Sequence, residues 1–278
     1  MQASSLKETE LLREEVFAKA ETLKVLPTLN TIISELLRVM NDPNSSFNQL
    51  FKIVKYDQAI SSKIISIANS AYYSRGATVV NLERAMVVIG FEEIKNIVMC
   101  LAFLKEVLGR WNLRQQDLTV LWMHSLKVGY AAKILSADTM IEDPEKAFTV
   151  SILHDLGKAV LYMYGEQYRN LIEEARRTGM DICILERETF GVDHQEVGYF
   201  MSVKWRFPEE FSNVIRRHHA RPDGQNALVD LVRAADLFIT NPKADLGAQS
   251  IILQREKERI ESEAKRISEL LGVANGGK

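Results

Sequence analysis

The feature that most constrains the fold is an apolar pattern with the period of an α-helix. It is clearest from residue 29 to residue 40, where Leu29, Ile32, Ile33, Leu36, Leu37 and Met40 recur at steps of three and four, and Pro43 then ends the helix. Alternating strand patterns of useful length are missing. We therefore predict an all-α, multi-helical fold, with further helices near 47–56, 58–69, 82–89, 92–108, 117–136, 165–178, 182–190, 194–203, 208–219 and 227–240.

The length of 278 residues favours two packed units. A polar connector lies near residues 109–116, and it suggests two helical halves that share a packed interface. We expect an N-terminal helical extension over 1–21, a first half over 22–112, a second half over 113–242, and a charged C-terminal helix with a frayed tail over 243–278.

Composition excludes several classes of protein. Thirty-five basic and 37 acidic residues give a net charge of -2, so bulk nucleic-acid binding is not expected. The longest apolar run, residues 97–104, is too short to cross a membrane, and the polar N-terminus does not resemble a signal peptide. Cys100 and Cys183 form no CxxC pair and are expected to be small core residues. We expect a cytoplasmic protein.

All five histidines lie in the second half of the chain, and the first 123 residues contain none. Imidazole and carboxylate groups on facing helices are ligands for divalent transition metals, and the set favours iron, manganese, nickel or zinc. His154 and Asp155 are adjacent, so they would flank a site, with Asp155 bridging two ions. Lys158 lies one turn further, where its ammonium group could meet a phosphate, and Gly157 would leave room for close approach.

Structural explanations for the same residues remain open at this point. A single helical histidine is more often a hydrogen-bonded core residue than a ligand. Asp155 and Lys158 could form an ordinary ion pair, and His218-His219 could be a solvated helix end. These explanations must all hold independently to account for the clustering of every histidine in one half.

The ordered pattern of these residues resembles the HD superfamily of metal-dependent phosphohydrolases. The matching residues are His124, His154-Asp155 in "LHDLGK", His194 in "DHQEVG", His218-His219 in "IRRHHARPDG", and Asp236 in "RAADLFI". The double histidine is similar to that of HD-GYP cyclic-di-nucleotide phosphodiesterases. The chain lacks their Gly-Tyr-Pro element, and Val120 stands where some of them carry a glutamate for a third metal. The resemblance therefore implies one or two ions rather than three.

The whole chain resembles the HDOD family of bacterial signalling proteins. The segments that carry this resemblance are "LPTL" at 26–29, "YDQAISSKIISIANSAYY" at 56–73, "NLERAMVVIGFEEIKNIV" at 81–98, "WMHS" at 122–125 and "VKWRFPEEFSNVIRRHH" at 203–219. It implies an HDOD-type first half packed on an HD-like second half. Two functions follow as expectations: hydrolysis of a phosphoester or nucleotide, with Asp155 and Lys158 as catalytic groups, or a non-catalytic signalling module with a structural or ligand-sensing site.

Two segments are candidates for contact with partners. The loop "NSAYYSRG" offers Tyr72, Tyr73 and Arg75 to a signalling protein or a phosphorylated ligand, although its tyrosines could instead pack between the two halves. Leu253, Ile260 and Ile267 recur every seven residues, which would suit a coiled-coil homodimer. The alternative is a surface helix packed on its own domain.

Overall fold

The fold is all-α, as predicted. The computed structural model describes residues 2–22, 35–39, 42, 44–74, 76, 78–104, 113–222 and 224–273, and no strand occurs in these ranges. Among them, no helix combines the length and apolar character needed to cross a membrane. The helices are α1 (Gln2–Thr22), α3 (Phe47–Val54), α4 (Gln58–Ala68), α5 (Leu82–Ile89), α6 (Phe91–Ala102), α7 (Gln115–Thr139), α8 (Pro144–Leu153), α9 (Leu156–Leu161), α10 (Glu166–Thr178), α11 (Ile182–Phe190), α12 (His194–Lys204), α13 (Glu209–Arg217), α14 (Ala227–Thr240), α15 (Ala248–Arg255) and α16 (Lys257–Leu271), with a short 3-10 turn η2 (Tyr162–Tyr164).

Local sequence signals set many of these boundaries. Asp57, Asn81, Asp143 and Asp193 each cap a helix N-terminus by accepting a backbone N–H with the side chain. Gly90 ends α5 with a φ of 95°, a conformation that favours glycine. Over the described residues, the bounds of the observed helices agree closely with the ranges predicted from the sequence.

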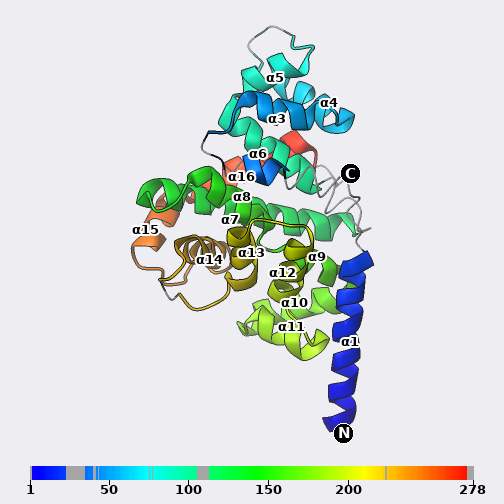
Figure 1. The fold of residues 1–278 in the computed structure, drawn as a ribbon. Helices are drawn as coiled ribbons and strands as arrows, with labels where there is room; N and C mark the ends of the chain where they lie inside the picture. Colours follow the sequence, from blue (N-terminus) through cyan, green and yellow to red (C-terminus); the bar gives the residue numbers. More distant parts are fainter. Residues whose placement is uncertain are drawn as a thin grey trace.

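Helix α7 is the central element of the molecule. Figure 1 shows α3–α6 at one end, α9–α13 at the other, and α7 with α8 between them. Helix α7 packs against α8, α14 and α16, and its Trp122 and Leu126 side chains are fully buried. Helix α8 packs against α6, and the ring of Phe103, directly after α6, stacks on Trp122, so α7 and α8 together connect the two ends of the core. Residues 26–29 and 105–112 lie outside the described residues, and the expected domain boundaries stay a prediction.

The N-terminal helix α1 packs on the second half of the chain, against α9, α11 and α12. Val16 is fully buried there, and the rings of Phe17 and Phe200 meet edge to face with centroids 5.0 Å apart. Arg13 donates to the carbonyl of Gly191 at 2.6 Å and pairs with Glu196 at 2.8 Å. Segments far apart in sequence are thus joined by both apolar and polar contacts.

The C-terminal helices α15 and α16 also pack on α7. Leu253, Ile260 and Ile267 are buried against the rest of the chain. Of the two alternatives, the structure therefore shows helices that pack on their own domain. These side chains are already used in intramolecular contacts. The homodimer stays a prediction, and an oligomer would have to use a different face of the helix.

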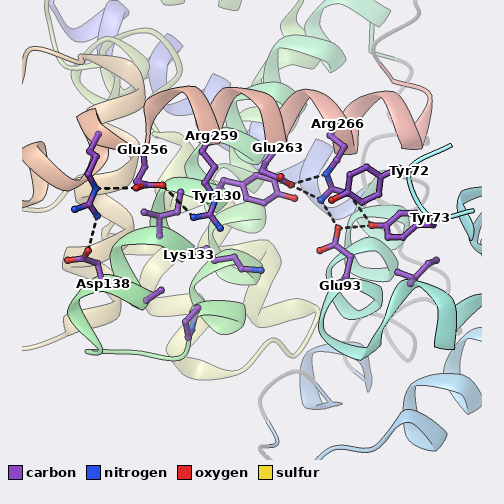
Figure 2. Close-up of a pocket in the computed structure, with 15 residues that line it drawn as sticks. Tyr72, Tyr73, Glu93, Tyr130, Lys133, Asp138, Glu256, Arg259, Glu263 and Arg266 are labelled. Atoms are coloured by element: carbon purple, nitrogen blue, oxygen red, sulfur yellow. Dashed lines mark hydrogen bonds and ion pairs between the residues drawn. The ribbon is translucent and has the colours of Figure 1, made fainter. Parts of the chain in front are cut away.

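A pocket of about 640 Å³ opens where α16, α7 and the first half meet (Figure 2). On one side of it, Arg266 of α16 donates to the Tyr73 hydroxyl at 3.0 Å and pairs with Glu93 at 2.7 Å. The guanidinium also lies 4.5 Å from the ring centre of Tyr72, which stays largely exposed. Tyr73 therefore joins the first half to the C-terminal helix, and Arg75 lies outside the described residues.

We predict that Arg266→Ala loosens this junction. It leaves the Glu93 carboxylate and the Tyr73 hydroxyl without their charged partner, which should lower the free energy of unfolding by about 2 kcal/mol. Arg259→Ala is a matched control on the same helix, because this arginine is exposed and makes one long contact to Glu256, so a change within about 0.5 kcal/mol is expected. Urea denaturation measures both, and equal shifts would contradict the assigned role of Arg266.

Candidate metal centre

Six helices bring the predicted ligand residues into one cluster. His124 lies in the middle of α7, His194 is the first residue of α12, and Asp236 lies in α14. His154 and Asp155 stand between α8 and α9, and His218-His219 follow α13. The ring centroid of His154 lies 5.3 Å from that of His124 and 4.9 Å from that of His218. The structure thus brings together every histidine that the sequence singled out, and the solvated-end explanation is wrong for His218, which is fully buried.

A break in the helix lets His154 and Asp155 serve one cluster although they are neighbours in sequence. Helix α8 ends at Leu153, and Asp155 has a φ of -94° and a ψ of 20°, outside regular helical geometry, before α9 begins. The side chains therefore do not diverge as they would in a continuous helix. His154 Nε2 lies 3.3 Å from Asp155 Oδ2.

Gly157 brings α12 close to this break. A Cβ atom at position 157 would lie 1.9 Å from the carbonyl oxygen of His194, and 2.7 Å from the backbone nitrogen of Gly198. Only glycine permits this approach of the two helices. The sequence suggested that Gly157 leaves space for a ligand, but the backbone of α12 fills this space. The close packing places His194 beside Asp155.

Hydrogen bonds fix which imidazole nitrogens face the cluster. Nδ1 of His154 lies 2.6 Å from the carbonyl of Ser151, and Nδ1 of His218 lies 3.0 Å from the carbonyl of Ile215. Because a carbonyl only accepts, each Nδ1 must carry a proton and donate. In the neutral rings, Nε2 then presents a lone pair to the cluster.

His194 is arranged in the same way, with Nδ1 2.6 Å from the Glu186 carboxylate. Its Nε2 lies 3.2 Å from Nε2 of His218. Two lone pairs facing each other at this distance repel unless a proton or a cation lies between them. In addition, His154 Nε2 and Asp155 Oδ1 are buried without a hydrogen-bond partner. These observations fit a bound cation.

The two oxygens of Asp155 divide the cluster into two sets of ligand atoms. The first, which we call the inner set, combines Asp155 Oδ1 with Nε2 of His194 and of His218, each 3.5 Å away. The second, the outer set, combines Asp155 Oδ2 with Nε2 of His124 at 3.2 Å and of His154 at 3.3 Å, together with Asp236 Oδ1, which lies 3.1 Å from His124. His219 Nε2 lies 3.8 Å from the other oxygen of Asp236. A shared carboxylate between two sets is the arrangement of a bridging ligand.

The electrostatics of the cluster also attract positive charge. Burial opposes ionisation of Asp155, but the attraction of His154 and Lys158 holds its pKa well below the usual range. Burial likewise opposes a charge on His124, yet its contacts with Asp155 and Asp236 raise its pKa to about 9. Asp155 and Asp236 therefore favour a positive charge beside them, which a proton on His124 supplies when no metal ion is bound.

The outer set is the more accessible one. The side chains of His154, His194 and His218 have no exposed surface, whereas His124 is 21% exposed and His219 is 23% exposed. Lys158 lies at this edge, with its ammonium 2.7 Å from Asp155 Oδ2. The cluster is therefore closest to solvent at His124, His219 and Lys158.

Sequence reasoning missed Glu186. The residue lies on the buried face of α11, three residues after Cys183 and four before Phe190, both of which are buried. An acidic residue on an apolar helix face was the available signal.

Both cysteines are buried and free, as expected, but the Cys183 sulfur also lies within 4.8 Å of ring nitrogens of His194 and His219.

Family comparison agrees with this architecture. The HDOD domain model matches residues 26–221, and the chain belongs to the HDOD family. It superposes on an HDOD domain protein of Geobacter sulfurreducens with a TM-score of 0.72 at 20% identity, covering 95% of this chain and 99% of that one. A candidate phosphohydrolase of Shewanella amazonensis SB2B gives a TM-score of 0.63 at 22% identity, covering 93% and 95%. At these identities, the likeness concerns the fold.

Curated relatives match only in part. An uncharacterised protein of Treponema pallidum (strain Nichols) is 22% identical over 228 residues, which is 79% of this chain and 43% of the relative. Ribonuclease Y of Desulfotalea psychrophila is 28% identical over 170 residues, or 61% of this chain and 26% of the enzyme. The chain thus spans less than half the length of both relatives.

We predict that Gly157→Ala disrupts the cluster through α12. The added methyl group must push the His194 backbone away, so metal affinity should fall by about tenfold or more. Leu50→Ala is the control, because Leu50 is fully buried in the first half and its loss costs about 2–5 kcal/mol without touching the cluster. Chelator competition measures affinity in the folded fraction of each variant, and an unchanged affinity in Gly157→Ala would refute this role of the glycine.

Proposed function

We propose that this HDOD protein is a cytoplasmic signalling protein whose HD-type site holds one or two divalent ions of iron, manganese, nickel or zinc and hydrolyses a phosphoester or nucleotide. One observation carries the metal proposal: Nε2 of His194 and Nε2 of His218 face each other at 3.2 Å while each Nδ1 is held by an acceptor. A cation between these nitrogens removes the repulsion. It also balances the charge of Asp155 and Asp236, two buried carboxylates that share the cluster with the ammonium of Lys158.

In this proposal the metal ligands are His124, His154, Asp155, His194, His218, His219 and Asp236. When bound, divalent ions in such a site polarise a phosphate oxygen and lower the pKa of a water molecule. Asp155 bridges the two sets with its two oxygens. Asp236 accepts from Thr240 at 3.3 Å, which helps to orient its carboxylate towards His124.

Lys158 has the position of a phosphate-binding group. Its ammonium donates to Asp155, and the attraction of Asp155 and Asp236 overcomes the effect of burial and keeps its pKa above the usual range. Lysine carries three donors, so two remain for the oxygens of a phosphate that enters at the exposed edge. A fixed positive charge there stabilises the charge that develops in the transition state. Asp155 and Lys158 are therefore the proposed catalytic residues.

The names of the relatives support a phosphate ester as the substrate class. A second Shewanella amazonensis SB2B structure, with a TM-score of 0.55 at 20% identity, is named as a candidate metal-dependent phosphohydrolase, and ribonuclease Y acts on a phosphodiester. The net charge of -2 argues against a long nucleic acid as the substrate. A small phosphodiester or a nucleotide is consistent with both observations.

The second candidate function is a non-catalytic module that binds a signalling partner. The observation in its favour is the exposed ring of Tyr72, which stands beside a pocket at the junction of the first half and α16 (Figure 2). Aromatic side chains with one polar end are common at protein interfaces. In this case the metal cluster would hold α7, α12 and α14 together without turnover.

The metal proposal predicts one or two ions per chain in protein purified without a histidine tag. Replacing both His154→Ala and Asp155→Ala removes a ligand from the outer set and the bridge between the sets, so elemental analysis should find less than about 0.2 ions per chain. Leu253→Ala, in a buried position on α15, controls for destabilisation alone. A wild-type protein with as little metal as the double variant would refute the proposal.

The hydrolysis proposal predicts turnover of a generic phosphodiester such as bis(p-nitrophenyl) phosphate by the metal-loaded wild type. Lys158→Gln removes the ammonium and should lower kcat about 100-fold while metal content persists. Lys204→Gln changes an exposed lysine on α12 and serves as the control. Turnover that survives in the His154→Ala/Asp155→Ala variant would come from another enzyme, and a metal-loaded wild type without turnover would favour the non-catalytic module.

A further inference from the structure

The pocket at the junction of the first half, α7 and α16 is separate from the metal cluster, because none of the described residues that line it is a ligand of the cluster. Its volume of about 640 Å³ falls within the range of small-molecule sites, which is roughly 300–1,000 Å³. Figure 2 shows that its walls come from the Tyr72 loop, helix α7 and helix α16. A ligand in this pocket would contact all three segments.

The four carboxylates that line the pocket are each paired with an arginine, two with Arg266 at 2.7 Å and two with Arg255 at 3.1 Å. They are Glu93, Glu263, Asp138 and Glu256. Their charges are thus balanced within the wall of the pocket. They repel an anionic ligand less than unpaired acidic groups would.

Three groups of the wall keep hydrogen-bond donors for a ligand. The guanidinium of Arg259 makes a single contact with a described residue, at 3.4 Å to Glu256, and the side chain is 68% exposed. On the α7 side, Lys133 donates to Glu145 at 2.6 Å and keeps two of its three donors. The hydroxyl of Tyr130, which also lines the pocket, forms no hydrogen bond with a described residue. Unused donors on two walls indicate a ligand rich in acceptor oxygens, such as a phosphate.

The other end of the pocket offers an aromatic surface. The guanidinium of Arg266 lies 4.5 Å from the ring centre of Tyr72, and the ring of Tyr73 meets that of Tyr72 edge to face at 4.7 Å. These two contacts hold the Tyr72 ring in place, yet the residue remains 61% exposed. A planar ring can therefore stack on it, and nucleobases stack on tyrosine with little dependence on the base.

The order of groups along α16 suits one small molecule. Arg259 and Arg266 are seven residues apart on this helix, which corresponds to a rise of about 10.5 Å. Because Tyr72 packs on Arg266, the aromatic surface lies about two turns from the free donors of Arg259. Ile89 and Ile134 add apolar surface to the same pocket. A mononucleotide carries its base and its phosphate at opposite ends of a ribose, so it matches this order.

We propose that the pocket binds a mononucleotide, with the base on Tyr72 and the phosphate between Arg259 and Lys133. The site goes beyond the proposed metal chemistry and does not depend on it. A bound nucleotide would join the first half to α7 and α16, and it would stabilise the junction that Arg266 and Tyr73 already hold.

The test is isothermal titration of the metal-free full chain with AMP, GMP, CMP and UMP. Arg259→Gln removes a charged donor, so the dissociation constant of the best-binding nucleotide should rise about tenfold. Tyr72→Ala removes the stacking surface and should also raise it about tenfold. The corresponding nucleoside, which lacks the phosphate, should bind Arg259→Gln as it binds the wild type and should lose affinity in Tyr72→Ala.

Lys265→Gln and Tyr56→Ala are the matched controls. Lys265 is a 73% exposed cation on α16 outside the pocket, and Tyr56 is an 82% exposed tyrosine of the first half. Both controls should keep the affinity of the wild type within about twofold. Arg259 and Tyr72 are exposed as well, so their substitution should leave the thermal midpoint of the nucleotide-free chain nearly unchanged.

The outcomes decide the inference separately from the proposed function. A wild type that binds none of the four nucleotides up to about 1 mM overturns the inference, as does an affinity that survives in both Arg259→Gln and Tyr72→Ala. Lys158→Gln distinguishes the pocket from the metal cluster. If it alone lowers the affinity, the nucleotide binds at the cluster, which overturns the inference and leaves the proposed metal site intact.

Discussion

The structure of the second half depends on the buried carboxylate of Asp155. A charge removed from water is unfavourable unless hydrogen bonds and opposite charges surround it, and Asp155 is contacted by His124, Lys158 and His194 from three different helices. These contacts require α7, α9 and α12 to meet at one point. Gly157 makes the meeting of α9 and α12 sterically feasible. The packing of the helices and the geometry of the cluster are therefore one constraint rather than two.

Much of the fold could be predicted from the sequence because its signals are local. The apolar period, the capping aspartates and Gly90 define helices within a few residues, and the spacing of the histidines indicated a shared site. The helix break at His154-Asp155 was not predicted, because "LHDLGK" contains no proline and its glycine follows the break. Only the packing of α9 against α12 shows what that glycine does.

Interactions between distant segments account for the rest. Glu186 is eight residues from His194, and the pairing of its carboxylate with that ring depends on the turn between α11 and α12. Arg266 and Tyr73 are separated by 193 positions and meet because α16 packs along α7. The helix propensity of a segment and the spacing of its apolar residues carry no information about contacts between distant segments. The sequence therefore indicated which residues lie together in the cluster but not which residues orient them.

The shape of the cluster bears on the choice between enzyme and module. A structural metal site is normally closed, with every coordination position taken by the protein, whereas a catalytic site keeps a position open. The inner set is enclosed by the protein, since His194 and His218 are fully buried and His194 is fixed by Glu186, although it offers only three ligand atoms. The outer set has the open character, since His124 and His219 reach the surface and the Lys158 ammonium stands beside them. A purely structural role would explain the inner set and the ion pair of Lys158 with the buried Asp155. The accessible edge of the outer set is the feature that supports the proposed hydrolysis of a phosphate ester.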